Sequence, residues 1–338
     1  MLKFTLQITN WYRQNKRDLP WRHTKDPYLI WLSEIILQQT RVEQGLPYYN
    51  KFSSIYPTVE HLAQANEEEV LLIWQGLGYY SRARNMLTTA QFILSDHSGN
   101  FPHSYQGLLK LKGIGPYTAA AIASFAFDEE TPVIDGNVFR VLSRYYGVDS
   151  AIDSREGKQQ ITELANLSID KKNPALYNQS IMEFGALQCK PKNPNCEICP
   201  LNDSCLSYFQ NKVQDRPLKI KKIKVTKRYF HYLVSKENEY LTLEKRTAND
   251  IWKGLYQFPL IELESTELTD DLITNFRISD SSSIYNHKLT HQTIFAIFHE
   301  SSNPPNNSLN QSKVAITDLE NFAFPRLIQR YLENKEFI

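Results

Sequence analysis

The sequence predicts a protein of two parts, a mainly α domain followed by a smaller α+β domain. In the first part apolar residues recur at helical spacing, and alanines crowd residues 118–127, where they favour a helix because alanine loses no side-chain entropy there. From residue 229 the pattern changes to short alternating runs that indicate β-strands. We expect an N-terminal domain at residues 1–211, a basic linker at 212–227 and a C-terminal domain at 228–338.

The composition indicates a soluble globular protein with a polyanionic partner. The chain has 338 residues, of which 41% are hydrophobic and 22% are charged. Residues 1–227 carry 27 Lys and Arg against 22 Asp and Glu, a net charge of +5, whereas residues 228–338 carry 11 against 15, a net charge of −4. A basic body suits a polyanion. No apolar run is long enough to span a membrane and no secretory signal is present, so we expect a cytoplasmic protein that binds no membrane.

Two helices are expected near the N-terminus. Residues 5–15 form an amphipathic pattern whose candidates for the buried side are Leu6, Ile8, Trp11 and Tyr12. Asp26 and Pro27 then provide an N-cap and a first helical residue for a helix over residues 28–42. This second helix is apolar nearly all round, so we expect it to be buried.

Glu34 lies on the apolar face of this second helix, in line with Ile30 and Leu37. Two interpretations are open. Glu34 is a structural acid paired with an arginine, or it is a general acid whose burial favours the protonated form. The polar end of the helix favours the second interpretation, because a new surface must begin there; it consists of Gln38, Gln39, Thr40 and Arg41.

A glycine-rich loop with aromatic and basic residues follows a turn and a helix expected at 56–73. The loop QGLGYYSRARN places Leu77 and Tyr79 beside two glycines and ahead of Arg82. Aromatic and apolar tips wedge into base stacks while arginines hold phosphates. A plain loop ahead of the helix expected at 82–94 is the alternative.

Residues 111–140 predict two helices joined by a tight glycine turn. Gly113 and Gly115 can adopt positive φ and let a ligand approach the backbone, and Pro116 suits the first turn of the second helix. The exposed N–H groups of such a helix N-terminus bind anions, phosphate above all. An ordinary turn between two core helices is the alternative. Asp135 follows this helix, where it could act on a nucleic acid held by the turn.

Further helices are expected beyond Asp135. Residues 138–147 are helical in pattern, and Arg140 and Arg144 are four residues apart on that helix, facing either DNA or solvent. Residues 155–187 contain two more helices.

All four cysteines fall within residues 189–205, with intervals of six, two and five residues between them. Such a cluster in a cytoplasmic chain indicates a metal centre rather than disulfides. Zinc is the common alternative, but zinc sites of four cysteines usually show two Cys-x2-Cys pairs, and here only one pair has that spacing. The uneven intervals suit a cluster with a larger core. The candidate ligands are Cys189, Cys196, Cys199 and Cys205.

The rest of the chain reads as a connector and a β-rich domain. Residues 212–228 hold eight Lys and Arg and one acid, typical of a linker that lies along DNA or is simply solvated. Thr290 and His291 lie at the start of one of the expected strands, and His291 is either a turn residue or part of a binding loop. Strands are expected at 229–235, 240–246 and 291–300, and a closing helix at 326–334.

Several of these motifs together resemble the adenine DNA glycosylases of the MutY family, within the endonuclease III superfamily. They are WLSEIILQQTRV, GLGYYSRARN, the glycine turn with Asp135, the cysteine spacing and IWKGLYQFP at 251–259. The resemblance covers nearly the whole chain. It implies a helix–hairpin–helix glycosylase domain with a structural 4Fe–4S cluster in an iron–sulfur cluster loop at 189–205, followed by an α+β Nudix-like domain.

The resemblance also implies roles for individual residues. Glu34 is the general acid, Asp135 stabilises the sugar cation, Asn137 orients these groups, and Tyr117 sits beside the sugar and Glu34. The expected partner is double-stranded DNA containing A:8-oxoguanine or A:G mispairs, acted on by a monomer in base excision repair. The residues implied to bind DNA are Gln38, Gln39, Thr40, Leu77, Tyr79, Arg82, Gly113, Gly115, Thr290 and His291.

Three positions depart from related patterns. Tyr117 stands where bifunctional relatives carry a lysine, and a phenol cannot form a Schiff base, so we expect a monofunctional enzyme that leaves an abasic site. Leu289 replaces the usual Phe of a Phe-Ser-His loop, and Tyr256 replaces a Trp.

The signature of a Nudix hydrolase is absent, which argues against a nucleotide hydrolase. A non-catalytic lesion-binding protein is the other alternative, and the presence of both Glu34 and Asp135 argues against it.

Overall fold

The computed structural model describes residues 2–220, 224–305 and 310–338, and the chain divides into two compact units. The first unit comprises Met1–Val42, Ser53–Ala63 and Thr88–Lys221, and the second comprises Glu43–Phe52, Gln64–Leu87 and Lys222–Ile338. Residues 221–223 of the expected linker lie outside the described residues. The expected domain limits at residues 211 and 228 stay predictions.

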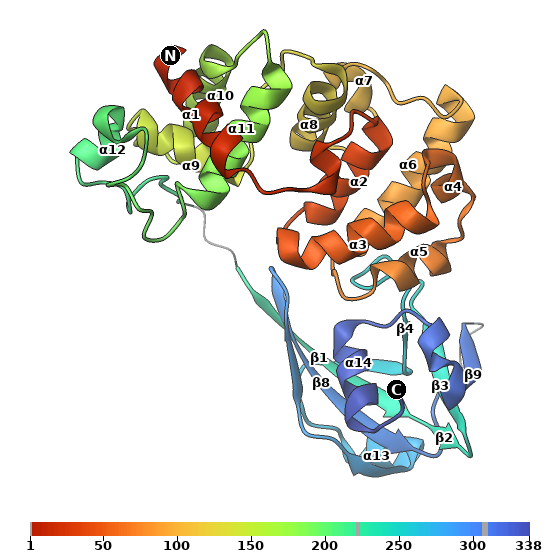
Figure 1. Ribbon diagram of the computed structural model, residues 1–338. Helices are drawn as coiled ribbons and strands as arrows, with labels where there is room; N and C mark the ends of the chain where they lie inside the picture. The colour runs from red at the N-terminus through yellow and green to blue at the C-terminus, as the bar shows by residue number, and fades with distance from the viewer. Residues whose placement is uncertain (1, 221–223, 306–309) are drawn as a thin grey trace. The chain divides into compact units, whose positions relative to one another are not determined.

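The first unit is helical (Figure 1). Two helices, α3 (Val42–Ile55) and α6 (Ser81–His97), are shared between the units, and α5 (Glu67–Trp74) lies in the second. The remaining helical elements of the first unit are α1 (Leu2–Asn15), η1 (Pro20–Arg22), α2 (Pro27–Leu37), α4 (Val59–Gln64), α7 (Tyr105–Leu108), α8 (Pro116–Phe127), α9 (Gly136–Tyr145), α10 (Arg155–Ser168), α11 (Pro174–Leu187), η2 (Asn202–Ser204) and α12 (Leu206–Phe209).

Helix α8 lies at the centre of this unit. It packs against α2, α7 and α11, and α11 also packs against α1 and α9. Every side chain from Thr118 to Phe125 is buried. The run of alanines expected to be helical therefore has a second effect, because small side chains let the neighbouring helices approach closely.

Several expected boundaries differ from the structure. α2 ends at Leu37 rather than at residue 42, because Gln39 adopts a φ of 56° and breaks the helix; a separate helix, α3, begins at Val42. The region 56–73 holds two helices instead of one, since the Asn66 side chain accepts a hydrogen bond from the Glu69 amide and starts α5. α1 begins earlier than expected, and Leu6 is 55% exposed rather than buried.

The second unit contains two sheets. One has the order β5 (Leu260–Leu263), β1 (Thr226–Val234), β8 (Gln292–Ser301) and β6 (Ile278–Ser281), with β7 (Tyr285–Lys288) also paired to β8. β1 and β8 run parallel. The other contains β2 (Lys236–Glu237), β3 (Tyr240–Lys245), β4 (Tyr256–Gln257) and β9 (Gln311–Ala315). The three strands expected from the sequence correspond to β1, β3 and β8.

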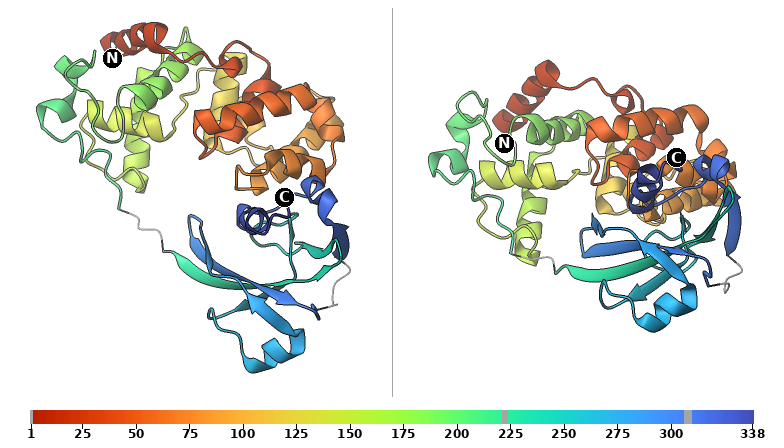
Figure 2. Two further views of the ribbon diagram at one scale, coloured as in Figure 1. Left: turned by 60° about the horizontal axis from the view of Figure 1, so that its bottom comes forward. Right: turned by 90° about the horizontal axis from the view of Figure 1, so that it is seen from below.

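Two helices accompany these sheets, α13 (Asp270–Phe276) and α14 (Arg326–Asn334). α14 is the expected closing helix, and it lies on one face of the larger sheet (Figure 2). The ring of Tyr331 stacks on the ring of Phe298 in β8, with centroids 3.9 Å apart. This contact fixes the last helix of the chain to the sheet.

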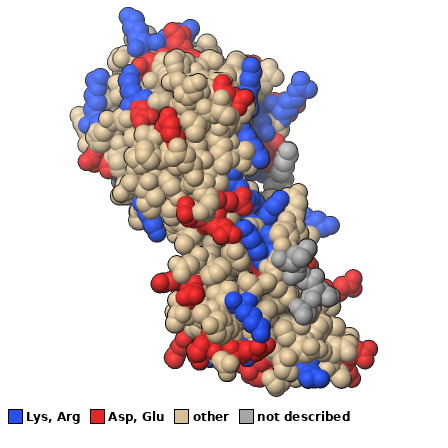
Figure 3. Space-filling view, turned by 90° about the vertical axis from the view of Figure 1, so that its right-hand side faces the viewer, with Lys and Arg blue, Asp and Glu red and all other residues tan. Residues whose placement is uncertain are grey.

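Charge is distributed without one dominant patch on the face shown in Figure 3, where Lys and Arg are interspersed with Asp and Glu. Within the described part of the chain, no helix combines the length and the apolar character that crossing a membrane needs.

Candidate functional site

Two carboxyl groups come together in the first unit from different helices. Glu34 lies in the buried part of α2, which begins where Asp26 accepts a hydrogen bond from the Tyr28 amide at 2.8 Å. Asp135 is the N-cap of α9 and accepts a hydrogen bond from the Val138 amide at 2.7 Å. The two groups are close enough that the charge of Asp135 raises the pKa of Glu34.

The surroundings of Glu34 favour its protonated form. Its side chain is only 6% exposed, and burial raises its pKa to about 7, with Asp135 adding to this effect. The hydroxyl of Tyr117, from the first turn of α8, donates to Oε2 of Glu34 at 2.6 Å and lowers the pKa, as does the charge of Arg22. A carboxyl with a pKa near neutrality can hold and release a proton at physiological pH.

Asp135 is better suited to carry negative charge. Burial raises its pKa, but donors oppose this: the Val138 amide, the Asn137 side chain at 2.7 Å and the Asn137 amide, together with the charge of Arg140. Within the described residues, Glu34 accepts a hydrogen bond from one group, the Tyr117 hydroxyl. Asp135 therefore has more donors than Glu34, and such donors favour the ionised form of a carboxyl group, although the pKa of Asp135 is still raised overall by burial.

A small cavity opens beside Glu34. Its volume is about 40 Å³, well below the roughly 300 Å³ or more of typical ligand pockets. Its lining residues are Trp21, Arg22, Ile30, Ser33, Glu34, Phe125, Gln179 and Met182.

The far wall of this cavity was not identified from the sequence. Gln179 and Met182 come from α11, and the side-chain oxygen Oε1 of Gln179 accepts a hydrogen bond from the Tyr12 hydroxyl at 2.9 Å. Trp21 and Arg22 come from η1. Sequence patterns could not bring these segments together, because Tyr12 and Gln179 are 167 residues apart in the chain.

The glycine turn differs in one respect from the expectation. Gly113 adopts a φ of 77°, as expected, but Gly115 has a φ of −88°. Gly115 precedes Pro116, and a residue before proline is driven to the extended region. Both glycines are exposed while Ile114 is buried. Gly115 caps α8 without a side chain, so the first amides of that helix remain available to an anion.

The polar segment after α2 lies beside this turn. The Gln38 side chain donates to the Thr118 hydroxyl of α8 at 3.2 Å. Gln39 is exposed, and Thr40 is half-buried. The first unit thus brings Glu34, the Gln38–Thr40 segment and the glycine turn together through α8.

The other expected DNA contacts lie in the second unit. Tyr79 is 48% exposed, and its hydroxyl hydrogen-bonds the Thr290 hydroxyl. Beside them is a cavity of about 470 Å³ whose lining includes Leu77, Tyr79, Trp252, Lys288, Leu289, Thr290 and His291. Tyr79 and Thr290 meet although they are 211 residues apart in the chain.

Leu77 and Arg82 are placed differently from the expectation. The Leu77 side chain is only 7% exposed, so Tyr79 alone forms the tip of the loop. Arg82 is 9% exposed; its guanidinium lies 4.9 Å from the Trp74 ring and donates to the Gly78 carbonyl at 3.1 Å. Arg82 holds the loop from inside instead of presenting its charge to phosphate.

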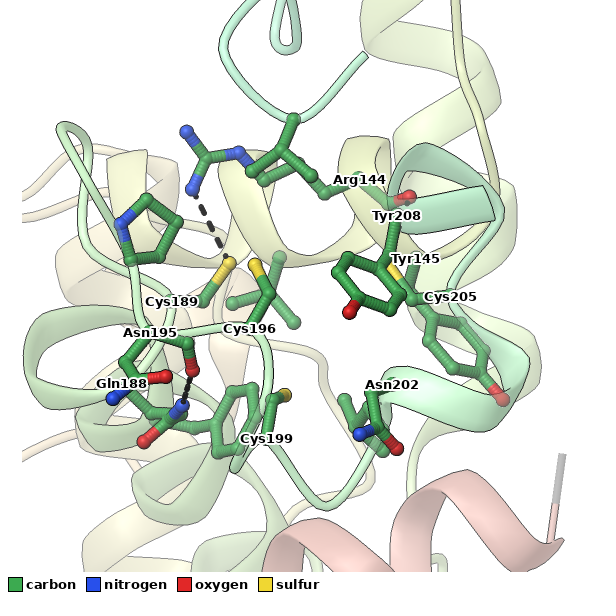
Figure 4. Close-up of a pocket in the computed structure, with 15 residues that line it drawn as sticks. Arg144, Tyr145, Gln188, Cys189, Asn195, Cys196, Cys199, Asn202, Cys205 and Tyr208 are labelled. Carbon is green, nitrogen blue, oxygen red and sulfur yellow. Dashed lines mark hydrogen bonds between the residues drawn. The ribbon is translucent and has the colours of Figure 1, made fainter. Parts of the chain in front are cut away.

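The four cysteines line one cavity of about 30 Å³ (Figure 4). Their sulfurs surround this cavity. Among the described residues, no group of three or more His, Cys, Asp or Glu side chains is close enough together to hold one metal ion. Burial, with a smaller contribution from the other cysteines, raises the pKa of the Cys199 thiol to about 12. Four thiolates so placed need a positively charged core between them, so the site fits a metal cluster.

Arg140 and Arg144 bind the cluster loop instead of facing DNA or solvent, so that expectation was wrong. Both are buried, at 8% and 2% exposed. Arg140 donates to the Cys189 carbonyl at 2.8 Å and to the Asn137 side chain at 2.8 Å. Arg144 lies 3.4 Å from the Cys189 sulfur and donates to the Arg216 carbonyl at 2.9 Å. The two guanidinium groups that were expected to face DNA or solvent instead donate hydrogen bonds to buried backbone carbonyls.

Three regions match known families. Residues 32–166 match the HhH-GPD superfamily of base excision DNA repair proteins, residues 189–205 match the iron–sulfur binding domain of endonuclease III, and residues 229–334 match the NUDIX domain. These matches confirm the expected fold class of both parts and the 4Fe–4S cofactor.

Curated relatives with similar sequences include two bacterial adenine DNA glycosylases. That of Buchnera aphidicola subsp. Schizaphis graminum is 39% identical over 257 residues, covering 76% of this chain and 74% of the relative. That of Buchnera aphidicola subsp. Baizongia pistaciae is 38% identical over 302 residues, covering 87% and 84%.

Similar solved structures cover the helical part. A thermostable thymine-DNA glycosylase is 30% identical with a TM-score of 0.57, covering 61% of this chain and 95% of that one. A non-covalent endonuclease III–DNA complex is 20% identical with a TM-score of 0.53, covering 61% and 94%. The second likeness shows the fold alone.

Proposed function

The chain belongs to the adenine DNA glycosylases, and from this premise we propose that it excises adenine paired with 8-oxoguanine or guanine in double-stranded DNA, leaving an abasic site. The observation that carries the proposal is the pair of buried carboxyl groups, Glu34 and Asp135. One is tuned to hold a proton near neutral pH and the other is surrounded by donors that stabilise its charge. Cleavage of an N-glycosidic bond requires that combination.

The chemistry begins with extrusion of the adenine from the duplex, because its glycosidic bond cannot be reached inside the stack. Glu34 donates its proton to N7 of the base while the bond between the sugar and the base breaks, and the bond electrons leave with the base. The sugar is left cationic, and ionised Asp135 stabilises it. A water oxygen then bonds to the sugar carbon and gives a proton to the Glu34 carboxylate, which restores the acid and completes the hydrolysis.

Neighbouring residues support these two groups. Asn137 donates to Asp135 and fixes its direction, and Tyr117 fixes Glu34. Tyr117 also excludes strand cleavage through a Schiff base at this position. A phenol forms no imine with the opened sugar, so this chain does not cut the DNA strand.

We assign recognition of the opposite base to the second unit. Tyr79 is exposed and hydrogen-bonded to Thr290, beside a cavity that His291 also lines. An aromatic ring can replace the extruded base in the stack, while hydroxyl and imidazole groups can hydrogen-bond an 8-oxoguanine edge. Leu289 supplies apolar surface but no ring.

DNA backbone binding is assigned to the exposed glycines 113 and 115 and to the segment 38–40. The 4Fe–4S cluster, held by Cys189, Cys196, Cys199 and Cys205, supplies a charged core that ties the loop 189–205 together. Arg140 joins that loop to Asn137, so the cluster supports the shape of the catalytic site without taking part in the reaction. We further propose that the protein acts as a monomer.

Single-turnover release of adenine tests the proposal, with duplexes that differ only in the base opposite adenine. We expect fast release opposite 8-oxoguanine, slower release opposite guanine and little opposite thymine. Borohydride should trap little covalent complex. Equal release from all duplexes would remove the assignment of opposite-base recognition, and binding of the mispair without any release would favour a non-catalytic lesion-binding protein.

A further inference from the structure

A buried carboxylate behind the catalytic cavity joins two arginines. Glu183 of α11 is 1% exposed. Its Oε2 lies 2.7 Å from Nη2 of Arg17 and 2.7 Å from Nη2 of Arg22. Its Oε1 accepts from Nε of Arg17 and from Nη1 of Arg22, each at 3.0 Å. Arg22 also donates to the Arg17 carbonyl at 2.9 Å, so the direction of the Arg22 guanidinium is fixed.

Arg22 connects this carboxylate to the cavity of the general acid. It lines the same cavity as Glu34, and its side chain is 12% exposed, so solvent screens its charge little. A cation in this position opposes protonation of Glu34, and the charge of Arg22 does lower the pKa of that carboxyl. An uncompensated unit charge at short range shifts the pKa of a buried carboxyl by about one unit or more.

Glu183 carries a negative charge that opposes the positive charge of Arg22. Burial raises its pKa, but the hydrogen bonds from Arg17 and Arg22 outweigh this and bring the pKa down to about 2. Glu183 is therefore ionised throughout the pH range in which Glu34 titrates. Its negative charge opposes that of Arg22 without titrating itself.

The groups that act on Glu34 from the surrounding elements are Tyr117 of α8, Asp135 at the start of α9 and Arg22 of η1. Arg22 is the cation among these three. We propose that Glu183 is a positioning residue that ties Arg22 back and offsets part of its charge, so that Glu34 keeps its proton at neutral pH. This inference rests on the proposed role of Glu34 as the general acid.

The test compares pH profiles of single-turnover adenine release from the A:8-oxoguanine duplex, with the full chain in excess. Glu183→Gln keeps the shape of the side chain but removes its charge. We expect its alkaline limb to move about one pH unit towards acid, so that the rate at pH 8 falls about tenfold while the rates at low pH converge.

Two further variants separate charge from structure. Glu183→Asp keeps the charge, so its alkaline limb should stay near that of the wild type. Arg22→Gln removes the cation, so its limb should move towards alkaline pH, opposite to Glu183→Gln. Thermal unfolding and visible absorbance of the bound cluster check that each variant is folded and loaded, and if Glu183→Gln does not fold, Arg22→Gln carries the test.

The outcomes distinguish this inference from the proposed function. If the wild type releases no adenine from any duplex, the proposed function fails. If the wild type is active but Glu183→Gln lowers the rate by one factor at every pH, Glu183 is merely structural and the inference is overturned. An unmoved alkaline limb in folded Arg22→Gln would overturn it as well.

Discussion

Replacing Glu34 by glutamine should stabilise the protein at alkaline pH much more than at acid pH. The pKa of Glu34 rises from 4.5 to about 7 in the folded protein, chiefly because the group is buried. A carboxyl with a raised pKa contributes stability that is complete below pH 4.5 and is lost as the pH rises to 7. Above that range the folded state holds a buried charge that the unfolded state leaves in water. Glutamine carries no charge at any pH.

The size of the effect follows from this shift of 2.5 units, 7 minus 4.5. Ionisation of Glu34 costs the folded state about 3 kcal/mol at pH 8 and about 1 kcal/mol at pH 5. The gain from Glu34→Gln should therefore be about 2 kcal/mol larger at pH 8. Since each kcal/mol moves Tm by about 2–4 °C in a domain of this size, the difference amounts to roughly 5 °C.

The assay is thermal unfolding of wild type and Glu34→Gln at both pH values, with equal cluster loading. Glu264→Gln, at an exposed glutamate of the second unit, controls for the loss of one acid. A change in Tm that is the same at pH 5 and pH 8 would refute the reasoning, because it would mean that Glu34 titrates alike in the folded and unfolded states.

Three other substitutions test separate parts of the account. Tyr117→Phe removes the hydroxyl that lowers the pKa of Glu34, so the alkaline limb of adenine release should move about one pH unit upward while Glu34 stays in place. Arg144→Gln leaves buried carbonyls and the Cys189 sulfur without their donor, at about 1–3 kcal/mol for each group, so iron content and Tm should both fall. Tyr79→Ala removes the exposed ring, so binding of the mispair should weaken about tenfold or more while the pH profile stays unchanged.

The position of Glu34 could be predicted because its signals are local. An N-cap at Asp26, a proline and a run of apolar residues define a buried helix, and a carboxylic acid in its middle has few ordinary explanations. Asp135 could be placed for a similar reason, since an acid ahead of Gly136 and a helical pattern is a natural N-cap. The cysteine spacing was equally local: it predicted a metal cluster, and the family resemblance identified the cluster as 4Fe–4S.

The groups around Glu34 could not be predicted, because they depend on packing between distant segments. Arg22 and Glu183 are 161 residues apart, and neither segment carries a sequence signal that predicts contact with the other. Arg140 and Arg144 were misplaced for the same reason. Two arginines four residues apart usually mark a solvated helix face, but here the acceptors are backbone carbonyls of a loop some fifty residues later.

The end of α2 was missed because no residue there signals a break. Glutamine is a good helix former, and only the positive φ of Gln39 ends the helix. The break has a consequence for the site, because it turns Gln38 towards Thr118 of α8. A straight helix through residue 42 would direct the same side chains elsewhere.

The central claim is that Glu34 and Asp135 act together on one extruded adenine. The most direct test is the single-turnover rate of Glu34→Gln and Asp135→Asn on the A:8-oxoguanine duplex, measured beside their affinity for that duplex. We predict that each variant binds the mispair almost as well as the wild type and releases adenine at least a hundredfold more slowly, about 3 kcal/mol of lost transition-state stabilisation. Release at the wild-type rate by either variant would contradict the claim.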